Sequence, residues 1–220
     1  MKPKFYDLAD LIISNIEGGY YSPIRHKSAA MMDSGETMFG MDRKHGGDDI
    51  NNSAAGKKFW AIIDQNSAAW SWNFKGGKFE KQLKKLAAEM MYNRFEKYSK
   101  LYLSDKARKI ANKSERILLH FFYACWNGAG WFKKFAEDFN TQCQKTHNIS
   151  ALEKSCIAAR KNSGNSLISK GGEKMEMMFT MINVKRGLKI AVITILTVGA
   201  GFGGYKVFKY FKDRKKHGKV

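Results

Sequence analysis

The chain has 220 residues, of which 44% are hydrophobic and 13% aromatic. This composition suits one packed domain with an appendage and excludes a wholly disordered chain or two large domains. The formal net charge of +19 favours anionic partners such as lipid headgroups, nucleic acid or a cell-wall polymer. The three cysteines are widely spaced with no Cys-x-x-Cys pattern, so we expect buried thiols, no disulfide framework, no metal and no cofactor.

The first half of the chain predicts one helix followed by an irregular insert. Residues 4–17 have apolar side chains at helical spacing. Residues 18–56 are rich in Gly, Ser, Asp and Asn, a composition that predicts turns with short strands. Residues 57–74 form an aromatic and apolar cluster.

The second half predicts a helical domain. Residues 77–103 form a long amphipathic helix, and residues 113–126 are almost all apolar, which is typical of a central helix. Residues 130–140 and 149–162 are further helices. The side chains expected to point inward from the long helix are Phe79, Leu83, Leu86, Met90, Phe95 and Leu101. The predicted fold class is therefore mainly α with a small β insert.

The C-terminal part predicts a membrane anchor. Residues 190–205 carry no charge between Lys189 and Lys206, and as a helix they extend about 24 Å. Ten basic residues and one acid fall within 185–220, with most of the basic residues after the apolar run, which predicts a cytoplasmic tail. The expected organisation is a domain over 1–165, a linker over 166–187, a transmembrane helix over 188–208 and a basic tail over 209–220.

Three short motifs occur in order along the domain. They are Ile16-Glu17-Gly18-Gly19-Tyr20-Tyr21, then Asp33-Ser34-Gly35-Glu36-Thr37-Met38-Phe39-Gly40-Met41-Asp42, then Ala124-Cys125-Trp126-Asn127-Gly128-Ala129-Gly130-Trp131. Together they resemble the glycoside hydrolase family 108 muramidases, relatives of the phage-type lysozymes. The resemblance covers residues 5–162 and implies a lysozyme-like α+β fold. The chain departs from the pattern at Phe39, where the family has an aromatic hydroxyl, and by about ten extra residues before Asp33.

The residues themselves support a catalytic role for Glu17. Hydrolysis of a glycoside needs a carboxylic acid that protonates the leaving oxygen. Glu17 follows an apolar helical pattern and precedes two glycines, where a side chain can reach a cleft and a sugar can approach the backbone. The partial negative charge at a helix C-terminus would favour the protonated form of this acid.

The second carboxylate stays open between two candidates. The resemblance implies that Asp33 and Thr37 hold the attacking water, and Glu36 is the rival base. Sugar contacts are expected from Gly18, Gly19, Tyr20, Tyr21, Asn127 and Trp131. The C–H faces of sugar rings stack on the aromatic rings of this set, and its glycines let a sugar approach the backbone.

The expected function is cleavage of the glycan strand of peptidoglycan by a phage virion or lysis protein. The acids Asp7 and Asp10 interrupt the N-terminal apolar pattern, so we expect no signal peptide and a virion route to the wall. The expected location is a virion membrane or host inner membrane, with the catalytic domain facing the wall. Expected partners are peptidoglycan, anionic lipid and virion proteins, with no specific nucleic acid. The alternatives are an inactive wall-binding protein on the same fold and a DNA- or lipid-binding protein driven by charge.

Overall fold

The computed structural model describes residues 3–15, 36–44, 46–66, 77–164, 168–180 and 183. The chain divides into two compact units, residues 1–175 and 176–220. Within the second unit, residues 176–180 are described as helical. All elements named below belong to the first unit.

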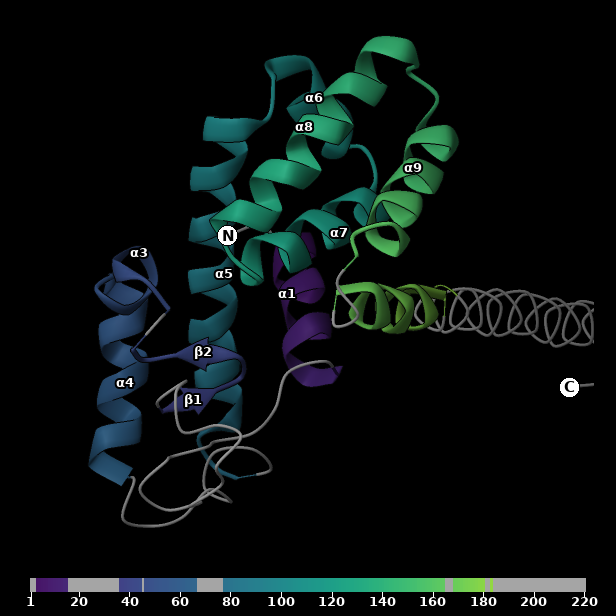
Figure 1. The fold of residues 1–220 in the computed structure, drawn as a ribbon. Coiled ribbons are helices and arrows are strands. Elements are labelled where there is room, and N and C mark those ends of the chain that lie inside the picture. Colours follow the sequence, from purple (N-terminus) through teal and green to yellow (C-terminus); the bar gives the residue numbers. More distant parts are fainter. Residues whose placement is uncertain are drawn as a thin grey trace, which may run out of the picture. The chain divides into compact units, whose positions relative to one another are not determined.

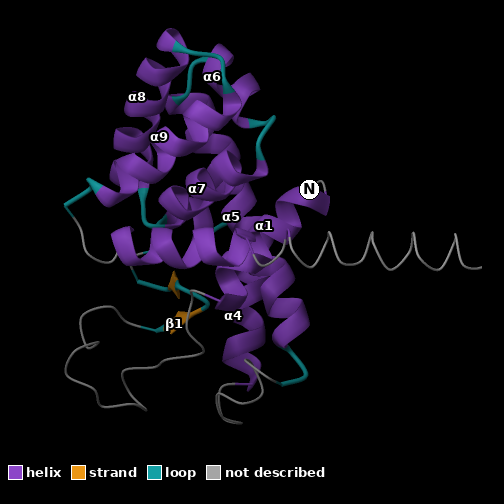
Figure 2. Cartoon of the chain, turned by 90° about the vertical axis from the view of Figure 1, so that its right-hand side faces the viewer, coloured by secondary structure: helices purple, strands orange, loops and turns teal. Residues whose placement is uncertain are grey.

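Helices dominate the described part of the first unit (Figures 1 and 2). Among the residues described, one antiparallel hairpin of two strands follows the first helix in chain order. The prediction of a mainly α fold with a small β insert is therefore confirmed. In chain order the elements are α1 (Pro3–Asn15), β1 (Thr37–Met38), β2 (Met41–Asp42), α3 (Asp48–Asn51), α4 (Ala54–Asn66), α5 (Glu80–Tyr102), α6 (Asp105–Ala111), α7 (Glu115–Trp126), α8 (Ala129–Lys145), α9 (Ile149–Lys161) and the helical residues 168–175.

The core is built around α7, whose side chains from Ile117 to Cys125 are all buried. A helix that is apolar all round is stable only when other helices cover it. Helices α1, α5, α8 and α9 all pack against α7. Aromatic rings join them: Phe122 lies 4.6 Å from Phe95 on α5 and 5.9 Å from Phe5 on α1, measured between ring centroids. Helix α7 is therefore the centre of the described core.

Side-chain caps set where several of these helices begin. The Ser114 hydroxyl accepts a hydrogen bond from the Ile117 amide and so caps α7. The same hydroxyl donates to Glu153 Oε1 at 2.6 Å, which joins the start of α7 to α9. Ser104 and Asn148 cap α6 and α9 in the same way.

The hairpin lies against one end of this bundle. Figure 1 shows it across the lower half of α5, beside α4. Asn51 ties the hairpin to α4, since its amide nitrogen donates to the carbonyl of Arg43 at 2.8 Å and its amide oxygen accepts from the Trp60 indole at 2.8 Å. These two hydrogen bonds therefore hold the hairpin against α4.

Several boundaries differ from those expected. The prediction that Leu101 points inward is wrong, because this side chain is 62% exposed near the end of α5. Residues 48–51 and 54–66 are helical, although turns and short strands were expected up to residue 56. Residues 168–175 lie in the predicted linker, yet they are helical and bury Met175 completely.

The expected transmembrane helix, 188–208, and the basic tail lie outside the residues that the structure describes. Among the residues that are described, no helix combines the length and apolar character needed to cross a membrane. The anchor stays a prediction.

The expectation of buried cysteines is confirmed. Cys125, Cys143 and Cys156 are free and buried. Burial raises the pKa of each thiol, so the neutral form is favoured and these side chains act as small apolar groups.

Candidate functional site

The hairpin turns tightly through two residues with left-handed backbone conformation. Phe39 has φ 53° and Gly40 has φ 71°, the pattern of a type I′ turn, which matches the twist of the two strands. Thr37 pairs with Asp42 and Met38 with Met41. Phe39, unlike glycine, is strained in this conformation, but its side chain is fully buried and anchors the turn.

An ion-pair cluster lies at the open end of the hairpin. Arg43 Nη1 donates to Glu36 Oε2 at 2.8 Å, and the same guanidinium forms a bidentate pair with Asp64 on α4 at 2.6 and 2.7 Å. Arg43 also lies over the Trp60 ring, 5.1 Å from its centroid. The hydrogen bond to Asp64 raises the pKa of Arg43 and lowers that of Asp64, so both groups stay charged at neutral pH.

A cavity of about 160 Å³ separates the hairpin from the end of α7, and we call it the hairpin cavity. The strand partner of Thr37, Asp42, lines it on one side, and Asn127 lines it on the other. The residues that line it are Gly40, Met41, Asp42, Gly46, Ile50, Arg94, Trp126, Asn127 and Gly128.

Arg94 supplies the buried charge of the hairpin cavity. It is 8% exposed and donates to Asp49 through Nε at 3.0 Å and through Nη2 at 2.9 Å. Nη2 also donates to the carbonyl of Gly46. Burial opposes the charged form of Asp49, but the hydrogen bonds and charge of Arg94 outweigh it and lower the pKa of this carboxyl.

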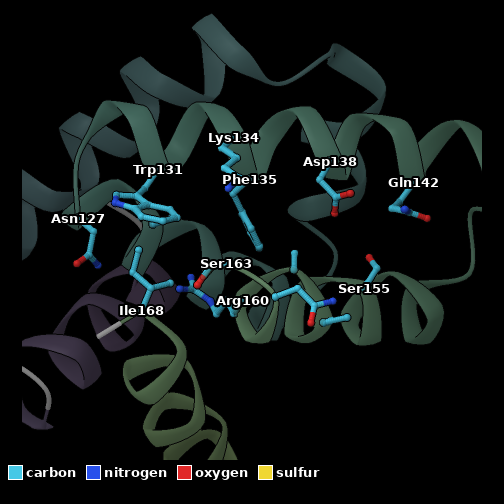
Figure 3. Close-up of a pocket in the computed structure, with 14 residues that line it drawn as sticks. Asn127, Trp131, Lys134, Phe135, Asp138, Gln142, Ser155, Arg160, Ser163 and Ile168 are labelled. Atoms are coloured by element: carbon cyan, nitrogen blue, oxygen red, sulfur yellow. The ribbon is translucent and has the colours of Figure 1, made fainter. Parts of the chain in front are cut away.

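A larger pocket of about 410 Å³ lies between α8 and α9, and we call it the α8–α9 pocket. In Figure 3, Trp131 and Phe135 extend from α8 toward the opposite wall, and Asn127 lies at one end. The Lys134 ammonium lies over Trp131, 5.6 Å from the ring centroid. Ala158, Ala159 and Ile168 give the opposite wall an apolar character, and amide and hydroxyl groups surround it.

A buried pair of basic side chains lies beneath this pocket. Arg160 lines the pocket and is 4% exposed. Its Nε donates to His120 Nδ1 at 2.5 Å, and its Nη2 donates to the backbone carbonyl of His120. Because Nδ1 accepts this hydrogen bond, it carries no proton. Tyr123 and Phe135 cover the guanidinium, which lies 4.8 and 5.2 Å from their ring centroids.

The sequence-predicted site residues fall into two groups. Glu17, Gly18, Gly19, Tyr20, Tyr21 and Asp33 lie outside the described residues. Glu36 and Thr37 lie together at the start of the hairpin, and Asn127 and Trp131 share the α8–α9 pocket. Asn127 alone of these four lines both cavities.

Sequence reasoning missed Arg43, Asp64 and Arg94. A signal for Arg43 was present, because the turn at Phe39 and Gly40 places residues 36 and 43 opposite each other as a cross-strand pair of opposite charge. Asp64 and Arg94 come from distant parts of the chain, and no local pattern marks them.

Within the part of the chain that the structure describes, no group of three or more His, Cys, Asp or Glu side chains is arranged to hold a metal ion. Comparisons of the sequence and structure with protein-family models, with curated proteins and with solved structures found no match.

Proposed function

We propose that this protein is a lysozyme-like peptidoglycan hydrolase that cleaves the glycan strand with Glu17 as general acid. The observation that carries the proposal is the hairpin cavity. It lies between a small β insert that begins with Glu36 and Thr37 and the helix junction at Asn127. Residues from two of the three sequence motifs thus border one cavity in an otherwise helical unit.

The anchoring of α1 in the core supports the choice of Glu17 as the acid. Glu17 follows the end of α1 by two residues. Helix α1 packs against α5 and α7, the two helices that carry Arg94 and Trp126 on the cavity wall. A carboxylic acid that follows such an anchored helix is suited to protonate a glycosidic oxygen held at the hairpin.

The ion-pair cluster supports a division of roles between the acids. Glu36 is held by Arg43, which is itself held by Asp64. This ion pair suits Glu36 to a structural role, in which its carboxylate holds the start of the hairpin in position. We therefore assign the second catalytic carboxylate to Asp33, with Thr37 orienting the attacking water.

Asn127 and Trp131 support a path for the glycan strand beyond the cleavage point. The strand would leave the hairpin cavity at Asn127 and continue along the α8–α9 pocket, where Trp131 offers an aromatic face. Such a path suits a polymer, because each further sugar adds contact area.

The net charge of +19 supports an anionic polymer as the substrate. We further propose that residues 188–208 anchor the protein in a phage virion membrane or host inner membrane, with the basic tail bound to anionic lipid and the domain turned to the wall.

The test measures loss of turbidity and release of reducing ends from purified cell walls by the full-length protein. The wild type is expected to clear the walls, and Glu17→Gln is expected to lower the rate at least 100-fold, the lower range for loss of general acid catalysis. Glu89→Gln, an exposed acid on α5, is the matched control and is expected to keep the full rate.

Equal rates for Glu17→Gln and wild type would remove Glu17 from the mechanism. Tight binding of the wild type to walls without reducing ends would instead support the inactive wall-binding protein.

A further inference from the structure

An acidic side chain lies directly opposite Thr37 in the hairpin. The register of the two strands pairs Thr37 with Asp42. The backbone amide of Arg43 donates to the carbonyl of Glu36 at 2.9 Å, which makes the adjacent pair the hydrogen-bonded one. Thr37 and Asp42 are therefore a non-hydrogen-bonded pair, whose side chains share one face of the hairpin with Cβ atoms about 4.5–5.5 Å apart.

Asp42 also borders the hairpin cavity. Among the described residues, it is the acid that lines this cavity. Asp42 and Thr37 are both half-buried, so each remains within reach of a water molecule. The family resemblance gives Asp42 no role, and only its position in the structure distinguishes it.

Three hydrogen bonds fix the position of Asp42. Its Oδ1 accepts from the backbone amide of Lys44 at 2.8 Å. Its backbone carbonyl accepts from the Gly46 amide at 2.8 Å and from the Asn51 side-chain amide at 3.1 Å. A carboxylate held in this way loses little conformational freedom when it acts on a bound molecule.

Two neighbouring acids at the open end of the hairpin are held differently. Glu36 and Asp64 both pair with the guanidinium of Arg43. Asp42 instead accepts from a backbone amide, and this bond occupies one of the roughly four acceptor sites of a carboxylate. Asp42 therefore suits contact with a substrate or a water better than the two paired acids do.

We propose that Asp42 is a further catalytic residue, whose carboxylate accepts a hydrogen bond from the attacking water that Thr37 orients. Two hydrogen bonds of about 2.8 Å place a bridging water between oxygens about 5–6 Å apart. Two opposed side chains of a non-hydrogen-bonded pair provide such a span. The assignment rests on the proposed function, and its new element is Asp42.

The hydrogen bond to Asp42 contributes to the proposed hydrolysis in two ways. The water oxygen bonds to the anomeric carbon as the glycosidic C–O bond breaks, the proton of Glu17 goes to the leaving oxygen, and one water proton goes to Asp33. The second water proton stays on the new hydroxyl group, and its hydrogen bond to Asp42 holds the water in line. The negative charge of Asp42 also stabilises the positive charge that develops on the sugar.

The experiment measures kcat and KM of the full-length protein on soluble wall fragments by release of reducing ends. Asp42→Asn keeps an oxygen that can accept from the Lys44 amide and removes the charge. Its kcat is expected to fall about 10- to 100-fold, with KM within about twofold of the wild-type value. Asp105→Asn changes an exposed acid on α6 that lines neither cavity, and this matched control should keep the wild-type kcat.

A second variant separates a catalytic role from a structural one. Asp42→Ala removes the carboxylate and leaves space beside Thr37 for a small carboxylic acid. Added formate supplies carboxylate oxygens in that space and is expected to raise the rate of Asp42→Ala several-fold. The same formate should leave the rates of the wild type and of Asp105→Asn unchanged. Urea denaturation reports whether each variant is folded.

The outcomes distinguish this inference from the proposed function. A wild-type kcat in Asp42→Asn overturns the inference, while wall cleavage by the wild type keeps the proposed function intact. A rate loss that follows loss of folded protein in both Asp42 variants, without rescue by formate, assigns Asp42 a structural role and also overturns the inference. Absence of wall cleavage by the wild type overturns the proposed function and this inference together.

Discussion

Arg94 on α5 holds Asp49, in the segment after the hairpin, by two charge-assisted hydrogen bonds of 3.0 and 2.9 Å. The two residues are 45 positions apart in sequence. Because Arg94 also donates to the carbonyl of Gly46, one buried side chain fixes a length of chain that borders the hairpin cavity. The shape of the candidate site therefore depends on this pair.

Removal of Arg94 is expected to destabilise the domain. Arg94→Met leaves Asp49 and the Gly46 carbonyl without their donor, at an expected cost of about 2–4 kcal/mol in the free energy of unfolding. Urea denaturation measures this. Arg108→Met breaks a more exposed pair with Asp105 and is expected to cost less than about 1 kcal/mol. Equal costs for the two variants would contradict a structural role for the Arg94 pair.

Acid is expected to weaken the same pair. The pKa of Asp49 is lowered from its usual value of 3.8, so its contribution to stability is complete above that value. The contribution is lost as the pH falls through the lower pKa of the folded protein. Asp49→Asn should therefore show a smaller loss of stability than the wild type between about pH 4 and pH 2. Parallel stability curves for the two proteins over this range would rule the explanation out.

The departure at Phe39 leads to a prediction about the turn. The side chain is fully buried, so the hydroxyl of Phe39→Tyr would need room and a partner inside the core. We expect a cost of about 1–3 kcal/mol in thermal or urea unfolding. Phe79→Tyr, at a partly exposed position before α5, is expected to change stability by less than about 0.5 kcal/mol. A fully stable Phe39→Tyr would show that the hairpin can rotate this ring toward water.

Trp131 offers a test of the proposed glycan path. Trp131→Ala removes the aromatic face of the α8–α9 pocket and is expected to raise the KM for wall fragments about 3- to 10-fold, with little change in kcat. Leu101→Ala removes an exposed apolar side chain on α5 that lines neither cavity and serves as the control. An unchanged KM in Trp131→Ala would place the glycan elsewhere.

Gly171 tests how residues 168–175 pack. A Cβ at this position would overlap the Tyr123 hydroxyl on α7. Gly171→Ala is therefore expected to cost about 1–3 kcal/mol, while Gly130→Ala, which meets no atom, should leave stability equal or higher. Adding Tyr123→Phe should recover part of the loss, because it removes the overlapping oxygen. No recovery in the double variant would argue against this contact.

The predicted helices agree best with the structure where the apolar pattern in the sequence is long. The helix expected over 77–103 is α5, from Glu80 to Tyr102, and the central helix expected over 113–126 is α7. Leu101 was placed inward by spacing alone, yet its side chain at the end of α5 is largely exposed. Periodicity identifies the face of a helix, but whether a given turn of that face is covered depends on where its neighbours end.

The candidate site could be predicted only in part, for a similar reason. Thr37, Glu36 and Asn127 carry local signals, since each belongs to a short motif with turn residues around it. Arg94 carries none, because a basic residue on an amphipathic helix is usually solvated and only its burial against Asp49 distinguishes it. The roles proposed for Glu17 and Asp33 rest on sequence.

The sequence by itself determined the fold class, the order of the main helices, the presence of short strands after the first helix and the burial of the cysteines, because these depend on residues close together in the chain. Only the tertiary structure decided that Arg43 joins Glu36 to Asp64, that Arg94 holds the segment after the hairpin, and that Asn127 lines both cavities. Such contacts form when helices far apart in sequence pack around α7. The free energy of that packing depends on side chains from distant segments, so no local sequence pattern predicts it.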